Sequence, residues 1–102
     1  MFTVGGLKFW FKHCPNETGF LTIEEDGFDS IPVTPYKGKT ICYVDDIING
    51  EVILEGEAYC SPNDLFDKAR GRKISLSRAI EGLSKDERTE IWYVYTKTTS
   101  RL

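Results

Sequence analysis

The spacing of apolar residues in this chain changes once, near Ser61, and that change limits the possible folds more than any other feature. Before it, apolar and polar residues alternate as in half-buried strands, most clearly over residues 7–13. After it, apolar residues recur at the spacing of an amphipathic helix. The pattern predicts a single α+β domain over residues 1–102. Residues 1–60 are expected to form an antiparallel sheet of about four to five strands, and residues 61–98 two helices.

Turn-forming residues divide the predicted sheet into strands. Asn49-Gly50 separates two apolar runs and suits the positive φ angles of a type I′ turn, so we expect a hairpin there. Pro15-Asn16 is expected to end the first strand, and residues 19–24 to form a second, short one. The two prolines of residues 31–35 predict an edge strand or a loop. Gly56, late in the last strand, indicates a bulge or the close approach of another group.

Capping residues predict where the helices begin. Residues 61–64 read Ser-Pro-Asn-Asp, which indicates a helix with Ser61 as its N-cap and an end near Gly82. Ser84 and Glu87 have the spacing of a capping box, so a second helix is expected to start at once. Residues 91–95 have strand-like propensity, but the capping box favours a helix through them.

One arginine falls inside the apolar stripe of the first predicted helix. On a helical wheel, Arg72 shares this sheet-facing stripe with six apolar residues: Leu65, Ala69, Leu76, Ala79, Ile80 and Leu83. A buried, unpaired charge is costly, so Arg72 must reach solvent, pair with a carboxylate such as Glu55 or Glu57, or meet a ligand. Ile74 lies among charged residues on the opposite face, which indicates either a contact with a second subunit or an ordinary solvated face.

Charge is divided unevenly along the chain. Residues 1–61 carry 10 carboxylates against 4 lysines and arginines, whereas residues 62–102 carry 9 lysines and arginines against 6 carboxylates. This division suits an anionic ligand, head-to-tail association, or simple docking of a basic helix on an acidic sheet. Five cations crowd residues 67–78, with Phe66 and Tyr59 close by, as a phosphate-bearing nucleotide or a charged protein partner would require. The net charge of −3 argues against binding to duplex nucleic acid.

Several function classes are disfavoured by what the sequence lacks. His13 and Cys14 are neighbours on a predicted strand and point to opposite faces, so they are poorly placed for catalysis. No zinc-ligand spacing and no glycine-rich phosphate loop occurs, so we expect no enzyme, no metal and no cofactor. The start of the sequence has no signal peptide and no run approaches a membrane span, so we expect three reduced cysteines and no membrane contact.

One combination of segments stands out within residues 51–95: Gly56–Asp64, Phe66-Asp67, Gly71–Ala79, Glu87-Arg88 and Ile91-Trp92. With these segments the chain resembles a group of small bacteriophage proteins. In that group a strand that ends in a small-residue–Cys–Ser/His–Pro step leads into a helix with Gly-Arg-Lys and a downstream Arg-Ala. The group is similar to the first-described Thoeris anti-defence sponges, which sequester cyclic ADP-ribose isomers, and some of which take up cyclic oligonucleotides, without cutting them.

The resemblance implies a phage-encoded, non-enzymatic sponge for a cyclic nucleotide or cyclic ADP-ribose signal. It also implies a homo-oligomer that acts in the cytoplasm of an infected bacterial host. The ligand-binding residues it implies are Arg72, Arg78 and Arg88 for phosphates, Phe66 and Tyr59 for base stacking, and Asn63 for a polar contact. The alternative function is a small inhibitor that binds a host defence protein directly, through the acidic first half and exposed aromatics such as Trp10.

Overall fold

The structure is a computed structural model that describes residues 1–22 and 33–99. It confirms the α+β class, with four strands followed by two helices. The strands are β1 (Phe2–Val4), β2 (Leu7–Thr22), β3 (Val33–Asp46) and β4 (Val52–Tyr59), and the helices are α1 (Lys68–Ala79) and α2 (Lys85–Thr99).

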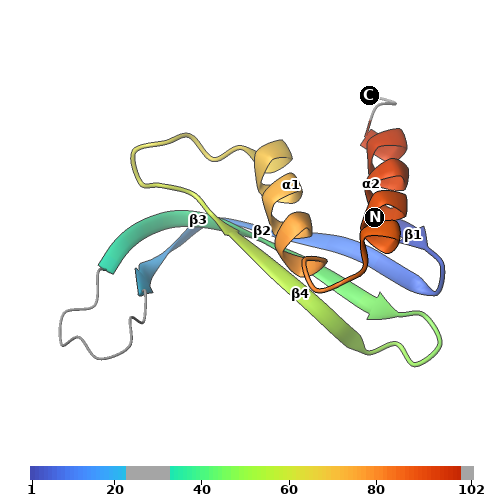
Figure 1. Ribbon diagram of the computed structural model, residues 1–102. Helices are drawn as coiled ribbons and strands as arrows, with labels where there is room; N and C mark the ends of the chain where they lie inside the picture. Colours follow the sequence, from blue (N-terminus) through green and yellow to red (C-terminus); the bar gives the residue numbers. More distant parts are fainter. Residues whose placement is uncertain (23–32, 100–102) are drawn as a thin grey trace.

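The strands form one antiparallel sheet in which spatial order equals chain order, β1-β2-β3-β4. Both helices lie on the same face of this sheet, as Figure 1 shows. α1 packs over β3 and β4, and α2 packs over β1 at the other edge. The second face of the sheet is covered by no described helix or strand, so we call it the open face.

The predicted break at Pro15-Asn16 is wrong, because β2 continues through it. The pairing of β2 with β3 shifts register between Cys14 and Thr18, so the prolyl nitrogen lies where no regular ladder bond is required of it. Residues 19–22 are part of this same strand. Pro35 pairs with Phe20 on one side and lies beyond the β3–β4 ladder on the other, so this end of β3 is an edge, although β3 as a whole is an inner strand of the sheet. Residues 23–32 lie outside the described part of the chain.

The hairpin between β3 and β4 is confirmed, but its turn is not the predicted two-residue type. Gly50 has φ of 69°, whereas Asn49 does not have the positive φ that a type I′ turn requires. The carboxylate of Asp46 shapes a longer loop, because it accepts hydrogen bonds from Ile48 N at 2.9 Å and from Asn49 Nδ2 at 3.2 Å. The backbone N–H of Asp46 closes the loop on Glu51 O at 2.8 Å.

The first helix begins later than predicted, and Ser61 is not its N-cap. Asp67 caps α1 by accepting a bond from Arg70 N at 3.2 Å, whereas Ser61 Oγ accepts from Asn63 N at 3.3 Å in a local turn. Residues 61–67 therefore form a loop. Leu65, which is 94% exposed, and Ala69 do not face the sheet as the helical wheel predicted.

The second helix matches its prediction. Ser84 Oγ accepts from Glu87 N at 3.2 Å, which is the first bond of the predicted capping box. The Glu87 carboxylate accepts from the Ser84 hydroxyl at 3.0 Å, where the full box has a bond from the Ser84 backbone N–H. α2 continues through residues 91–95.

The core lies between the sheet and the two helices. Phe2 and Phe9 stack with ring centroids 4.7 Å apart, and Tyr95 of α2 closes over Phe2 at 5.7 Å. The side chains that fill this core are Phe2, Phe9, Cys42, Val44, Leu76, Ala79, Ile80, Ile91 and Tyr95. Gly56 has no space for a side chain, because a Cβ there would collide with the α1 backbone at Ser75 and Ala79. The predicted close approach at Gly56 is therefore confirmed.

Candidate functional site

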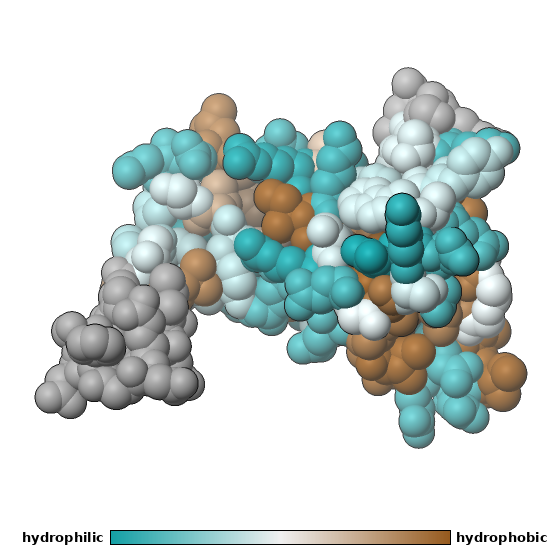
Figure 2. All heavy atoms as spheres, viewed as in Figure 1, coloured by the Kyte–Doolittle hydropathy of each residue, from teal (hydrophilic) through white to brown (hydrophobic). Residues whose placement is uncertain are grey.

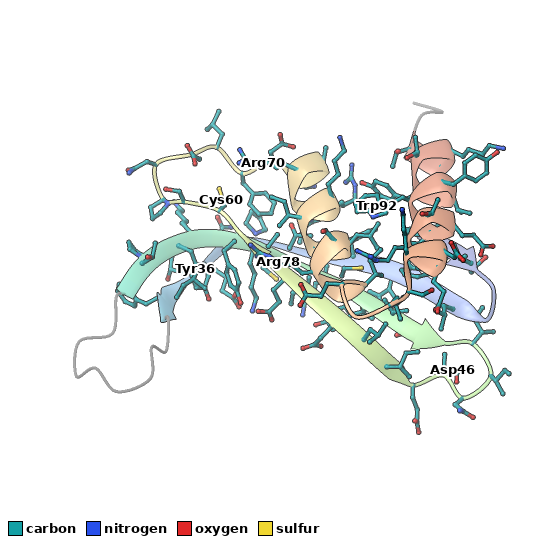
Figure 3. All side chains as sticks on the ribbon, in the orientation of Figure 1. Tyr36, Asp46, Cys60, Arg70, Arg78 and Trp92 are labelled. Atoms are coloured by element: carbon teal, nitrogen blue, oxygen red, sulfur yellow. The ribbon has the colours of Figure 1, made fainter. Side chains whose placement is uncertain are left out.

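A cleft of about 610 Å³ opens between the end of β4, the loop of residues 61–67 and the first turns of α1. Figure 3 shows Cys60 where this loop leaves β4 and Arg70 where the chain enters α1. The lining combines aromatic rings, an amide, a guanidinium and an apolar wall, contributed by Tyr59, Phe66, Asn63, Arg70 and Ile74. We call this hollow the α1 cleft.

The loop that forms one side of the α1 cleft is folded around the thiol of Cys60. Cys60 is attached to the sheet by two backbone bonds, from Cys60 N to Gly38 O and from Lys37 N to Cys60 O, each 2.9 Å long. Its Sγ lies 3.5 Å from Ser61 O and 3.7 Å from the carbonyl oxygens of Asp64 and Leu65. The loop is thus held in place by contacts of the Cys60 thiol with the loop backbone and by bonds to the backbone of β3.

Phe66 is fixed in place at the base of the loop. Its ring meets His13 edge to face, with centroids 6.1 Å apart. Gly38 has φ of 94°, and a Cβ there would lie 2.6 Å from the Phe66 ring, so the backbone of β3 packs directly on this side chain. The ring therefore presents a defined surface to the cleft.

Arg70 is the cation that lines the α1 cleft. It is exposed, and within residues 1–22 and 33–99 its guanidinium forms no hydrogen bond or ion pair. Two carboxylates, Asp64 and Asp67, also line the cleft, but Asp67 is engaged as the cap of α1. Ile74 is half-buried and faces the loop, so it is not the isolated apolar residue that the helical wheel indicated.

Tyr59 reaches from the cleft towards the open face. Its hydroxyl donates to Glu57 Oε2, and its ring meets Tyr36 with centroids 4.7 Å apart. Burial, and then the hydrogen bond to Glu57, raise the pKa of Tyr59 to about 12. Lys39 lies 2.9 Å from Glu17 and 4.0 Å from Glu57, which completes a polar cluster around this tyrosine.

The six residues implied by the resemblance do not form one site. Tyr59, Asn63 and Phe66 line the α1 cleft together. Arg78 lies in a second hollow of about 500 Å³, whose other charged residues are all acidic, and its Nη1 donates to Glu57 O at 2.6 Å. Arg88 is exposed on α2 and lines neither hollow.

Arg72 has a third environment. It is half-buried on the sheet-facing side of α1, and it helps to lower the pKa of His13 on β2, after burial of that ring and ahead of Lys68. Among the described residues no carboxylate pairs with Arg72, so the expected alternative of a salt bridge to Glu55 or Glu57 is wrong. The wheel placed this arginine correctly, but it does not line the α1 cleft.

Sequence reasoning did not select Arg70, Cys60 or Ile74 as site residues. The signal for Arg70 was present, since Asp67 is a good capping residue three positions before it. Because the helix was predicted to start at Ser61, Asp67 was not recognised as its cap.

Comparison of the chain with protein-family models, with curated proteins and with solved structures finds no match. The described residues include no group of three or more His, Cys, Asp or Glu side chains arranged to hold a metal ion. The same residues contain no helix that is long and apolar enough to span a bilayer. The three cysteines are unpaired.

Proposed function

We propose that the protein is a non-enzymatic sponge that binds a cyclic nucleotide or cyclic ADP-ribose signal in the α1 cleft. The observation that carries this proposal is the convergence of aromatic rings and an unpaired guanidinium in one preformed hollow. Its volume of about 610 Å³ lies within the range of small-molecule sites. The resemblance supplies the setting that we propose, a phage-encoded oligomer in the cytoplasm of an infected bacterium.

The lining of the α1 cleft suits the two ends of a nucleotide. Phe66 and Tyr59 offer aromatic surface to a base, and Ile74 adds an apolar wall. Asn63 has both a donor and an acceptor for a base edge or a ribose hydroxyl. The planar fork of Arg70 matches two oxygens of a phosphate.

The polar groups around the cleft favour binding without catalysis. The pair that most resembles a nucleophile and its base is Thr40 and His13, with Oγ1 and Nδ1 2.9 Å apart. Thr40 lines the α1 cleft, but it is only 1% exposed, and α1 packs on it so closely at Gly71 that a Cβ there would collide with the threonine. Its hydroxyl is therefore shielded from a substrate held in the cleft.

Replacement of Arg70 tests the proposal. Thermal shifts are measured against a panel of cyclic ADP-ribose isomers and cyclic di- and trinucleotides. A ligand at a hundredfold excess over its Kd stabilises the folded state by about 2.7 kcal/mol. We expect Arg70→Gln to weaken binding about tenfold or more, because a charge-assisted phosphate contact is lost.

Lys73→Gln is the matched control, since it removes the same charge from an exposed position of α1 that does not line the cleft. The bound ligand is recovered after denaturation and its mass compared with that of the free compound, and an unchanged mass is expected. A flat response to the entire panel, or equal weakening by both substitutions, contradicts the proposal.

A second candidate function, inhibition of a host protein by direct binding, is favoured by the end of the β3–β4 hairpin. Four apolar residues there are exposed: Ile47, Ile48, Val52 and Ile53. Brown spheres gather at this end of the sheet in Figure 2. Asp46 and Glu51 flank them, which gives an apolar patch with an acidic margin.

A pull-down from host lysate separates the two functions. A stoichiometric protein partner that survives nuclease treatment and is lost with Ile48→Ser favours the inhibitor. Ile48 is 88% exposed, so this substitution is expected to leave the fold intact.

A further inference from the structure

His13 of β2 and the two cations Lys68 and Arg72 of α1 form a basic cluster where this helix packs on the sheet. Gly71 packs directly on Thr40, whose Oγ1 lies 2.9 Å from His13 Nδ1, so this turn of the helix lies over His13. Lys68 and Arg72 are one helical turn apart, and both act electrostatically on His13. The α1 cleft lies on a neighbouring side of α1. Phe66 separates the cleft from His13, because its ring lines the cleft and packs edge-on against the imidazole.

The positive charge of this cluster has no counterpart in the described residues. Neither Lys68 nor Arg72 forms an ion pair or a side-chain hydrogen bond within residues 1–22 and 33–99. Arg72 is half-buried, so water compensates its charge only in part. Burial of the ring, and then the positive charges of Arg72 and Lys68, lower the pKa of His13, since protonation would add a third positive charge to the cluster.

The hydrogen-bonding geometry also suits an anion. Where Thr40 Oγ1 donates to His13 Nδ1, the neutral imidazole carries its proton on Nε2 and this N–H is a donor. The guanidinium of Arg72 presents two parallel donors, and the ammonium of Lys68 adds a point charge.

We propose that Lys68, Arg72 and His13 form a binding site for a phosphoryl oxyanion, separate from the walls of the α1 cleft. Two sources would supply this chemistry, namely the phosphates of a ligand held in the cleft and free phosphate or diphosphate. The site does not depend on the cleft ligand, and diphosphate alone is a sufficient probe.

The test uses the imidazole signals of His13, which are unambiguous because His13 is the single histidine of the chain. Sodium diphosphate is titrated into the full-length protein at fixed pH and ionic strength, with sodium chloride as the reference titration. We expect a saturable change in the His13 ring resonances with diphosphate and none with chloride. Arg72→Gln is expected to weaken this binding about tenfold or more, and Lys73→Gln to leave it unchanged.

Arg72→Lys retains the charge without the planar fork, and intermediate affinity is expected. If Arg72→Gln does not fold, Lys68→Gln, at an exposed position, takes its place with an expected several-fold loss. The absence of a saturable change, or a response that neither Lys68→Gln nor a folded Arg72 variant weakens, overturns the site.

The same signals distinguish the two sources of phosphate. A panel nucleotide that shifts the His13 resonances and competes with diphosphate supplies its own phosphate to the site. A nucleotide that binds without either effect indicates free phosphate as the source. Binding of diphosphate with no response to any nucleotide would refute the proposed function and leave this site standing.

Discussion

At Gly56 the absence of a side chain allows α1 to pack close to β4. The backbone of α1 at Ser75 and Ala79 occupies the space that a Cβ would need. We expect Gly56→Ala to lower the free energy of unfolding by about 1–3 kcal/mol, as overpacking against rigid atoms does. Urea denaturation measures this change.

Gly82→Ala is the control for that substitution, since nothing lies within 4 Å of a Cβ there and its φ is not positive. We expect it to be neutral or slightly stabilising. Equal stability of the two variants would show that α1 moves away from β4 at little cost.

Tyr59 provides a test at high pH. Its pKa rises from an ordinary 10.0 to about 12 in the folded protein, so the folded state retains a proton that the unfolded chain releases. The stabilisation from this group is therefore complete below pH 10 and is lost as the pH approaches 12. Cys42, also raised to about 12 by burial, acts in the same direction from pH 9 upward.

We expect stability to decline between pH 10 and 12, and to decline less steeply in Tyr59→Phe. Chemical denaturation at a series of pH values gives both slopes. The slope that remains in the variant contains the contribution of Cys42. Identical slopes in the two proteins would mean that the Tyr59 hydroxyl ionises equally easily when folded and unfolded.

Among the elements, α2 depends most clearly on a short local signal. Ser84 exchanges two hydrogen bonds with Glu87 at the start of this helix. We expect Ser84→Ala to cost about 1 kcal/mol of stability, the usual value of a lost N-cap. Thermal unfolding followed by circular dichroism measures it.

Ser77→Ala is the comparison for Ser84→Ala, because Ser77 is exposed within α1 and caps nothing. It should be close to neutral. A cap substitution no more harmful than this one would show that tertiary contacts alone hold the start of α2.

The helices and strands also show that a local sequence signal predicts structure well when no neighbouring residue provides a rival signal. The helix cap at Ser84 and the close approach at Gly56 were correctly predicted, because no nearby residue offers an alternative. Ser61 and Asp67 are both favourable N-cap residues, and the helical wheel does not distinguish between them. Asn49-Gly50 located a hairpin but not its turn, because the carboxylate of Asp46 makes the stronger local bonds.

The candidate site was predictable only in part for the same reason. Tyr59, Asn63 and Phe66 belong together because they follow one another along the chain into the loop. Arg78 and Arg88 were grouped with them through the resemblance, and the structure places each elsewhere. Arg70 and Ile74 can be placed in the cleft only when the start of α1 is known, and the cap at Asp67 sets that start. The environment of Arg72 could be predicted only with the knowledge that His13 of β2 lies near it.

For the molecule as a whole, Cys42 reports on global unfolding. It is fully buried in the core, and burial raises its pKa to about 12, whereas Cys14 and Cys60 are only half-buried. Near pH 8 we expect a thiol reagent to modify two cysteines of the native protein, and the third only as fast as the whole fold opens.

Cys42→Ala should remove the slow phase of this reaction and leave the fast phase unchanged. Added denaturant should accelerate the slow phase in proportion to the unfolded fraction. Three equally rapid reactions in the native protein would show that the core opens locally at Cys42.

The contact between α2 and β1 joins the last described helix to the first strand. On the ribosome, β2, β3, β4 and α1 emerge in the order in which they pair, so each hairpin forms beside the strand made just before it. Phe2 is different, because one of its covers, Tyr95, lies in α2 and is translated after the other described elements. The apolar edge of the nascent sheet at β1 therefore stays exposed until α2 is synthesised and packs over it.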